Sequence, residues 1–187
     1  LSHFKPSNSC LTLWDACETN DLSFDLRGLI QLESGPLSSD APGTDYPSFN
    51  RLDAVTQHDL SYPEGVTGIK VNVKAQGLHF LMGAVFANSL EKGTVAATLK
   101  MHYEDGSSDT MSLIGKKEIF DWQDKNGVSG LEEGKTGWIG RNPFGTWVTL
   151  TKPYWKNPHP DKVITHFDFV SGMVAAAPFL IAVTAER

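Results

Sequence analysis

Residues 95–114 read VAATLKMHYEDGSSDTMSLI, and this stretch decides the fold class. Every second residue from Val95 to Tyr103 is apolar, with mostly polar residues between them. A period of two is the side-chain period of a β-strand with one buried face. Asp105 and Gly106 then separate this run from a second alternating run, and an Asp-Gly pair in that position indicates a tight hairpin. We therefore expect residues 95–114 to form two antiparallel strands.

Other segments repeat the strand pattern at intervals typical of an all-β protein. The expected strands are residues 66–75, 78–86, 95–103, 108–114, 147–151, 163–170 and 179–185. Residues 78–86, LHFLMGAVF, form a nearly continuous apolar run, which suits a strand buried on both faces. Glycine, proline and polar residues predict long loops over residues 34–50 and 123–146. The spacing favours an antiparallel two-sheet β-sandwich over a parallel α/β sheet.

Composition limits the partners of the chain. The chain has 187 residues, 16 Lys and Arg against 22 Asp and Glu, and a formal charge of −6. A length in this range predicts one domain, residues 1–187, with residues 1–24 as a peripheral segment. Without a basic cluster the chain is not expected to bind nucleic acid, and no apolar run has the length of a membrane-spanning helix. The first residue is Leu1, so we expect a piece or a processed form of a longer protein.

Three long stretches resemble a known kind of module. They are GIKVNVKAQGLHFLMGAVFA (68–87), GTVAATLKMHYEDGSSDTMSLIGKKEIFDW (93–122) and KNPHPDKVITHFDFVSGMVAAAPFLIAVTAE (156–186). They resemble galactose-binding-like β-sandwich modules of bacterial secreted proteins, which carry "HYADG", "I.DW" and "NPHPDKEI" blocks in the same order. The resemblance implies a jelly-roll sandwich with a non-catalytic role, appended to carbohydrate-active or cell-surface proteins. The shared residues look mainly structural, so the resemblance does not name a ligand.

Sugar binding needs an aromatic face with amide, carboxylate or guanidinium groups beside it. Five tryptophans are a large number for one domain of this size, and three of them lie between residues 138 and 155. Their roles divide between core packing and a sugar platform. Our candidate ligand-binding residues are Trp138, Trp155, Arg141, Asn142, Tyr154 and Tyr46. Trp122, in the shared Asp-Trp motif, and Trp147 are expected in the core.

Metal sites and disulfides have weak support in the sequence. The six histidines show no HxH or HExxH spacing, so no transition-metal site is expected. Loop carboxylates can hold a structural calcium ion, and Asp21, Asp25 and Asp105 are candidate ligands, although no EF-hand-like spacing supports any of them. No other cofactor is expected. Cys10 and Cys17 either form a short disulfide loop, which would suit an exported protein, or remain free thiols.

We expect a non-catalytic carbohydrate-binding module that targets a larger exported protein to a polysaccharide. Its partners would be a polysaccharide or oligosaccharide and the catalytic or sensory domains of that parent protein. The expected location is secreted, periplasmic or cell-surface. One alternative is a structural or sensory domain that contacts proteins and binds no sugar. Another is a jelly-roll polysaccharide lyase, in which His102, Tyr103, Arg141 and Asn142 would supply the chemistry. A glycosidase based on Glu132 and Glu133 has less support.

Overall fold

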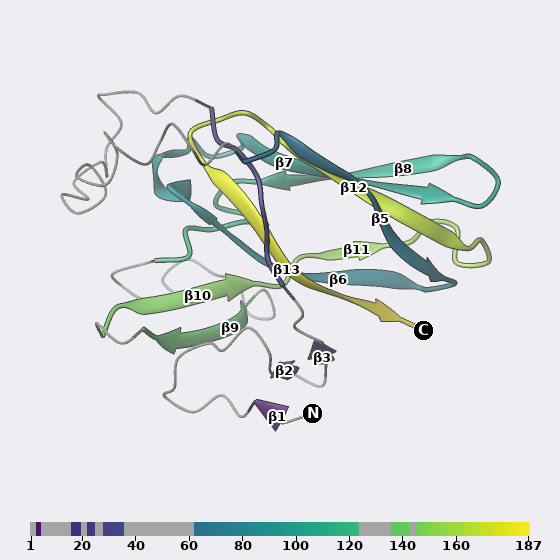
Figure 1. Ribbon diagram of the computed structural model, residues 1–187, viewed down its shortest axis with the longest axis horizontal. Coiled ribbons are helices and arrows are strands. Elements are labelled where there is room, and N and C mark those ends of the chain that lie inside the picture. The colour runs from purple at the N-terminus through teal and green to yellow at the C-terminus, as the bar shows by residue number, and fades with distance from the viewer. Residues whose placement is uncertain are drawn as a thin grey trace.

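Two antiparallel β-sheets pack face to face in the computed structural model (Figure 1). The structure describes residues 28–35, 62–123, 136–142 and 145–187, together with the backbone of three short strands nearer the N-terminus. These strands, β1 (His3–Phe4), β2 (Ala16–Thr19) and β3 (Leu22–Phe24), form a small separate sheet. The all-β sandwich expected from the sequence is confirmed.

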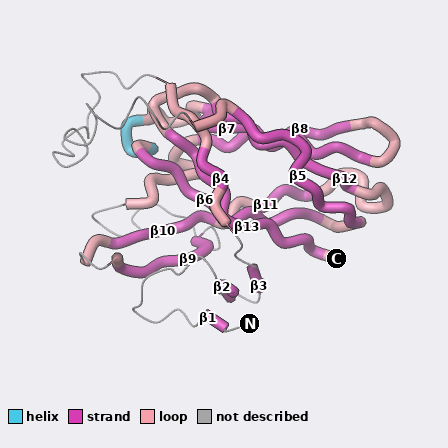
Figure 2. The backbone as a smooth tube through the Cα atoms, viewed as in Figure 1, coloured by secondary structure: helices cyan, strands magenta, loops and turns pink. Residues whose placement is uncertain are grey.

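One layer of the sandwich is a six-stranded sheet in the order β4-β13-β6-β10-β9, in which β11 also pairs with β6 (Figure 2). Its strands are β4 (Ile30–Gln31), β6 (Gly77–Val85), β9 (Thr136–Arg141), β10 (Trp147–Thr151), β11 (Tyr154–Lys156) and β13 (Ala177–Glu186). The central strand β6 is buried along almost its whole length, as its apolar run predicts. A single 3₁₀ turn, η1 (Ala87–Ser89), follows it.

The other layer is a four-stranded sheet in the order β5-β12-β7-β8. Its strands are β5 (Gly65–Val73), β7 (Val95–Tyr103), β8 (Ser108–Ile114) and β12 (Ile164–Ser171). The β7–β8 hairpin has the bounds expected from the sequence, and Gly106 takes the positive φ of 82° that its turn requires. Phe167 and Phe169 of β12 are fully buried, as predicted.

The main core lies between the two sheets. Its largest fully buried side chains come from both layers, and the ring of Phe80 meets the ring of Phe167 edge to face at 5.5 Å. Burying a phenylalanine side chain contributes roughly 1.5–3 kcal/mol, so these two rings stabilise the packing of one sheet on the other. The strict alternation expected for β7 is wrong at its start, because a β-bulge between Val95 and Ala97 leaves Val95 38% exposed.

The expected loop over residues 123–146 is wrong in part, because β9 occupies Thr136–Arg141. Strand β9 pairs with β10 as an antiparallel hairpin, so two of the candidate residues, Trp138 and Arg141, lie on a strand. A second short strand, β11, holds Tyr154 and Trp155 against β6. The expected strand over residues 147–151 coincides with β10.

The motifs that carry the family resemblance meet in one buried network. Asn157 is 4% exposed, and its side-chain Nδ2 donates to the Ala75 carbonyl at 2.8 Å. Its Oδ1 accepts from the His159 amide at 2.9 Å and lies 2.7 Å from the Tyr103 hydroxyl. The tyrosine of the hairpin motif and the asparagine of the closing motif therefore fix each other.

No helix among the described residues has the length and apolar character needed to cross a membrane.

Candidate functional site

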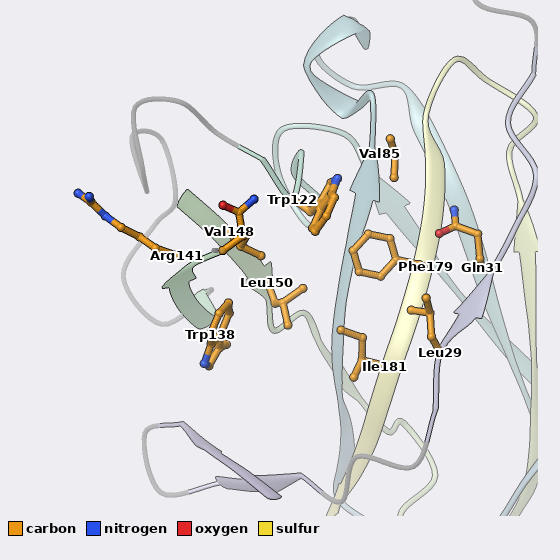
Figure 3. Close-up of a pocket in the computed structure, with 11 residues that line it drawn as sticks. Leu29, Gln31, Val85, Trp122, Trp138, Arg141, Val148, Leu150, Phe179 and Ile181 are labelled. Atoms are coloured by element: carbon orange, nitrogen blue, oxygen red, sulfur yellow. The ribbon is translucent and has the colours of Figure 1, made fainter. Parts of the chain in front are cut away.

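A pocket of about 260 Å³ lies on the outer face of the six-stranded sheet, the face turned away from the four-stranded sheet (Figure 3). One wall is the β9–β10 hairpin, and the floor is formed by β6, β13 and the β4 edge. The lining residues are Leu29, Gln31, Val85, Trp122, Trp138, Arg141, Asn142, Val148, Leu150, Phe179 and Ile181. Seven of them belong to, or pack against, a second apolar cluster separate from the main core.

A β-bulge in strand β13 places two of its side chains, Phe179 and Ile181, in the lining of this pocket. Its register against β6 shifts between Leu180 and Ala182, which inserts Ile181 as an extra residue. Leu180 points into the main core, whereas Phe179 and Ile181 belong to the cluster on the outer face. The Phe179 ring packs on Gly83 of β6, where a Cβ atom would lie only 2.8 Å from the ring. The lack of a side chain at Gly83 therefore gives the ring its place on the floor.

Trp122 reaches the pocket because its chain segment is wedged between β6 and β10. The Ala84 amide donates to the Phe120 carbonyl at 3.1 Å, and the Trp122 amide donates back to Ala84 at 2.9 Å. The Thr149 amide of β10 donates to the Trp122 carbonyl at 2.9 Å. β10 therefore pairs directly with β6 only at Thr151. At Thr149 the segment that contains Trp122 lies between the two strands and bonds to both. This segment separates the β9–β10 hairpin from β6, and the pocket lies in the space between them.

The hairpin wall places the other indole. Trp138 is 4% exposed, and its ring packs over Gly140, where a Cβ atom would collide with it. Asn142 shapes the turn, because its Oδ1 accepts from the Thr146 amide at 3.0 Å. The guanidinium of Arg141 lies 4.3 Å from the centre of the Trp147 ring. Figure 3 shows the Arg141 side chain extending away from the pocket, so its stem lines the wall and its charge lies outside.

The lining is almost entirely apolar, with polar groups at its edges. Gln31 Nε2 donates to the carbonyls of Leu32 and Ala177, each at 3.3 Å. The volume lies just below the roughly 300–1,000 Å³ of drug-sized ligand pockets. The pocket can therefore take a group of about one ring, held by apolar contact and stacking.

The six candidate residues do not meet in one place. Trp138, Arg141 and Asn142 line the pocket. Trp155 packs in the main core between the sheets and does not line the pocket. Tyr154 is 39% exposed but does not line the pocket. Tyr46 lies outside the described residues.

Sequence reasoning missed Trp122 and Phe179 as pocket residues. Trp122 was expected in the core, but it is partly exposed and its ring forms a pocket wall. The apolar character of Trp122 and Phe179 gave no hint of this, because core and pocket residues share it. The signal that exists is the pair of glycines in β9, since Gly140 leaves room for the Trp138 ring.

Tyr154 belongs to a small polar group elsewhere on the same sheet. Its ring lies 4.5 Å from that of His79, and burial together with a hydrogen bond to Glu186 raises the pKa of Tyr154 to about 12. Burial lowers the pKa of His79, and the charge of Lys152 lowers it further, while Glu186 acts in the opposite direction. At neutral pH both rings are therefore uncharged.

The four residues considered for a lyase are not assembled. His102 and Tyr103 are neighbours on β7 and point to opposite faces. Tyr103 is 3% exposed, and burial, followed by its hydrogen bond to Asp109, raises the pKa of its hydroxyl. Arg141 is the last residue of β9 in the other sheet, and Asn142 follows it. Asp105, a candidate calcium ligand, instead pairs with Lys162 at 2.7 Å.

Several other candidates fall in parts of the chain that the structure does not describe. These are Asp21, Asp25, Glu132, Glu133, Cys10 and the side chain of Cys17.

One group of metal-ligating side chains occurs among the described residues. His102, His166 and Asp168 each offer a ligand atom, and these atoms lie within 4.8 Å of one another. The sequence gave no such expectation, because His102 is far from the other two along the chain. The outward positions of β7 and the His-x-Asp spacing of β12 were the available signals.

No family model, no curated protein and no solved structure matches the chain.

Proposed function

We propose that the protein is a non-catalytic module that binds a glycan in the pocket on the outer face of the six-stranded sheet. The observation that carries the proposal is the pairing of two indoles, Trp122 and Trp138, around one ring-sized apolar pocket. A pyranose presents an apolar C–H face, and aromatic rings are the side chains that bury such a face with least loss of conformational freedom. Polar groups at the pocket edge would bind the hydroxyls.

The lining narrows the class of glycan. Eight of the eleven lining residues are apolar, and the polar ones, Gln31, Arg141 and Asn142, come from β4 and the end of the β9 strand. A sugar hydroxyl pushed against the apolar floor would lose its hydrogen bonds with water without replacement. A sugar that carries a methyl or acetyl group fits better, with the substituent on the floor and the hydroxyls at the mouth.

The resemblance to galactose-binding-like modules supports a carbohydrate ligand and a place in a larger exported protein. In that setting the module would hold a catalytic or sensory partner domain on a polysaccharide outside the cell. A secreted, periplasmic or cell-surface location would give the module access to a polysaccharide that lies outside the cell. The jelly-roll topology of such modules agrees with two packed antiparallel sheets.

A protein-contact role is the second candidate, and the apolar lining favours it as well. An apolar side chain from a partner protein could fill the same pocket, with exposed Leu29 at its edge as a further contact. The two candidate functions can be distinguished by competition. A free oligosaccharide would displace the natural ligand from the pocket only if that ligand is a glycan.

The proposal is tested by affinity electrophoresis on a panel of plant, algal and host polysaccharides. The matched variants are Val85→Phe and Val170→Phe. Val85 is half-buried and lines the pocket, so a phenylalanine there fills it. Val170 is 38% exposed on the four-stranded sheet, so the same change there leaves the pocket open. Thermal unfolding of both variants reports whether the fold is kept.

We expect retention of the wild type and of Val170→Phe on at least one polysaccharide, and loss of retention for Val85→Phe. Equal retention of both variants would place the glycan elsewhere. Absence of retention on every polysaccharide would reject the glycan and favour the protein-contact candidate. Release of unsaturated sugars, seen as new ultraviolet absorbance, would instead favour a lyase.

A further inference from the structure

We infer that His102, His166 and Asp168 form a binding site for a divalent transition-metal ion on the outer face of the four-stranded sheet. The Nε2 atom of His102 lies 2.7 Å from Oδ2 of Asp168, and one ligand atom from each residue lies within 4.8 Å of the others. All three side chains are partly exposed, so an ion can reach them from solvent. Two imidazoles and one carboxylate are a donor set suited to ions such as Zn²⁺.

A β-bulge brings the two histidines together. Ile164 pairs with Tyr103 and His166 pairs with His102, so Thr165 is an extra residue on β12. Without the extra residue, Ile164 and His166 would share a face, because side chains alternate along a strand. The bulge lets Ile164 stay fully buried while His166 turns outward. The imidazoles of His102 and His166 then stack, with ring centres 4.4 Å apart and an angle of 8°.

A second bulge fixes the carboxylate. Phe167 and Phe169 of β12 pair with Ile69 and Val66 of β5, which leaves one extra residue on β5. Gly68 takes a φ of 73° there, and its amide donates to Oδ1 of Asp168 at 2.9 Å. This bond occupies one carboxylate oxygen and fixes the orientation of the side chain, so that Oδ2 faces the imidazole of His102.

Thr165 sets the tautomer of His166. Its Oγ1 donates its one proton to the His102 carbonyl at 3.0 Å, so towards His166 Nδ1, at 2.9 Å, it can act only as an acceptor. Nδ1 of His166 must then carry the ring proton, which leaves the Nε2 lone pair for a metal ion. An outer partner that orients a ligating imidazole in this way is the usual arrangement of protein metal sites.

Binding requires small side-chain movements. Zn–N and Zn–O bonds are about 2.0–2.2 Å long, so the ligand atoms must close on the ion by rotation of the exposed rings. The ion takes the place of the proton shared by His102 and Asp168, and water completes a four-coordinate site. Lys70 of β5 pairs with His166, and Lys100 of β7 pairs with Asp168. The positive charges of these two lysines repel a metal ion and so weaken its affinity for the site.

The test is a titration of the folded chain with Zn²⁺, followed by two-dimensional NMR of the histidine rings. We expect the ring signals of His102 and His166 to shift together at one equivalent of ion. His102→Gln and Asp168→Asn should each weaken the binding at this site beyond the 10- to 100-fold that is typical of losing an orienting partner. Thr165→Val, which removes such a partner, should weaken it by roughly 10- to 100-fold.

His159→Gln is the matched control, because His159 is exposed and lies away from the cluster, against the Tyr103 ring. It should leave the shifts of His102 and His166 unchanged. The inference is overturned if Zn²⁺ at millimolar concentration shifts neither ring. It is also overturned if Asp168→Asn binds as tightly as the wild type while its thermal unfolding is unaltered. This outcome is independent of glycan binding, which concerns the other sheet.

Discussion

The ring of Trp122 meets the ring of Phe179 edge to face, with centres 6.3 Å apart and an interplanar angle of 85°. Trp122 comes from the segment wedged between β6 and β10, and Phe179 comes from β13. The contact therefore ties the pocket wall to its floor. Since the aromatic contact shapes the pocket, its loss should affect both stability and binding.

Phe179→Ala should lower the free energy of unfolding by about 3 kcal/mol, because the ring is 5% exposed and its removal leaves a cavity beside Gly83. Urea denaturation measures this change, and glycan retention should fall in the same variant. A loss below about 1 kcal/mol would mean that the outer-face cluster contributes little packing, since Ile→Val alone typically costs that much.

Asn157→Ala should be among the more damaging single changes in the sandwich. It leaves the Ala75 carbonyl and the His159 amide without their side-chain partner, and it removes an acceptor beside the Tyr103 hydroxyl. Buried groups left unsatisfied cost about 1–3 kcal/mol each, so we expect a loss of about 3 kcal/mol.

Tyr103→Phe removes one member of the same network and should cost about 1 kcal/mol. The double variant should be less destabilised than the sum of the two single variants, because the residues share a hydrogen bond. Strict additivity in chemical denaturation would contradict the coupling between the hairpin motif and the closing motif.

Gly68→Ala isolates the backbone cost of the β5 bulge. A Cβ atom at Gly68 would meet no neighbour within 4 Å, but the residue has a φ of 73°. An L-residue in this region costs about 1–2 kcal/mol, so the variant should lose that much stability without a steric clash. Gly28→Ala is the matched control, since Gly28 also has open space and no positive φ. Equal stability of the two variants would argue against the bulge.

Acidification should destabilise the protein partly through His79. Its Nδ1 is buried without a hydrogen-bond partner among the described residues, and burial lowers its pKa in the folded state. In the unfolded chain His79 binds a proton near pH 6.5, so below that pH the unfolded state holds more protons. The free energy of unfolding should therefore fall as the pH falls from 7 to 5. His79→Gln should show a shallower fall, and equal slopes would contradict this assignment.

The strands could be predicted from the sequence wherever local pattern dictates them. Alternation placed β7 and β8, and the Asp105-Gly106 pair placed their turn. Strand β9 escaped because Gly137 and Gly140 give it the composition of a loop. Those glycines are needed for close packing, against Leu81 and the Trp138 ring, and such packing is invisible before the chain is folded.

The site was less predictable because it depends on contacts between distant segments. Trp138 and Trp155 both sit in short strands, yet one lines the pocket and the other fills the core. Which face a strand buries follows from its pairing, and no local pattern fixed the pairing of β9 or β11. The same reason hid the cluster on the four-stranded sheet, where His102 and His166 become neighbours only through the β7–β12 register.

The most direct test of the central claim is an NMR titration of the indole N–H signals with an oligosaccharide of the retained glycan. The account predicts that the signals of Trp122 and Trp138 shift and saturate together, whereas that of the core residue Trp155 stays in place. Shifts confined to other tryptophans, or an unchanged spectrum with the glycan bound, would contradict a glycan site in this pocket.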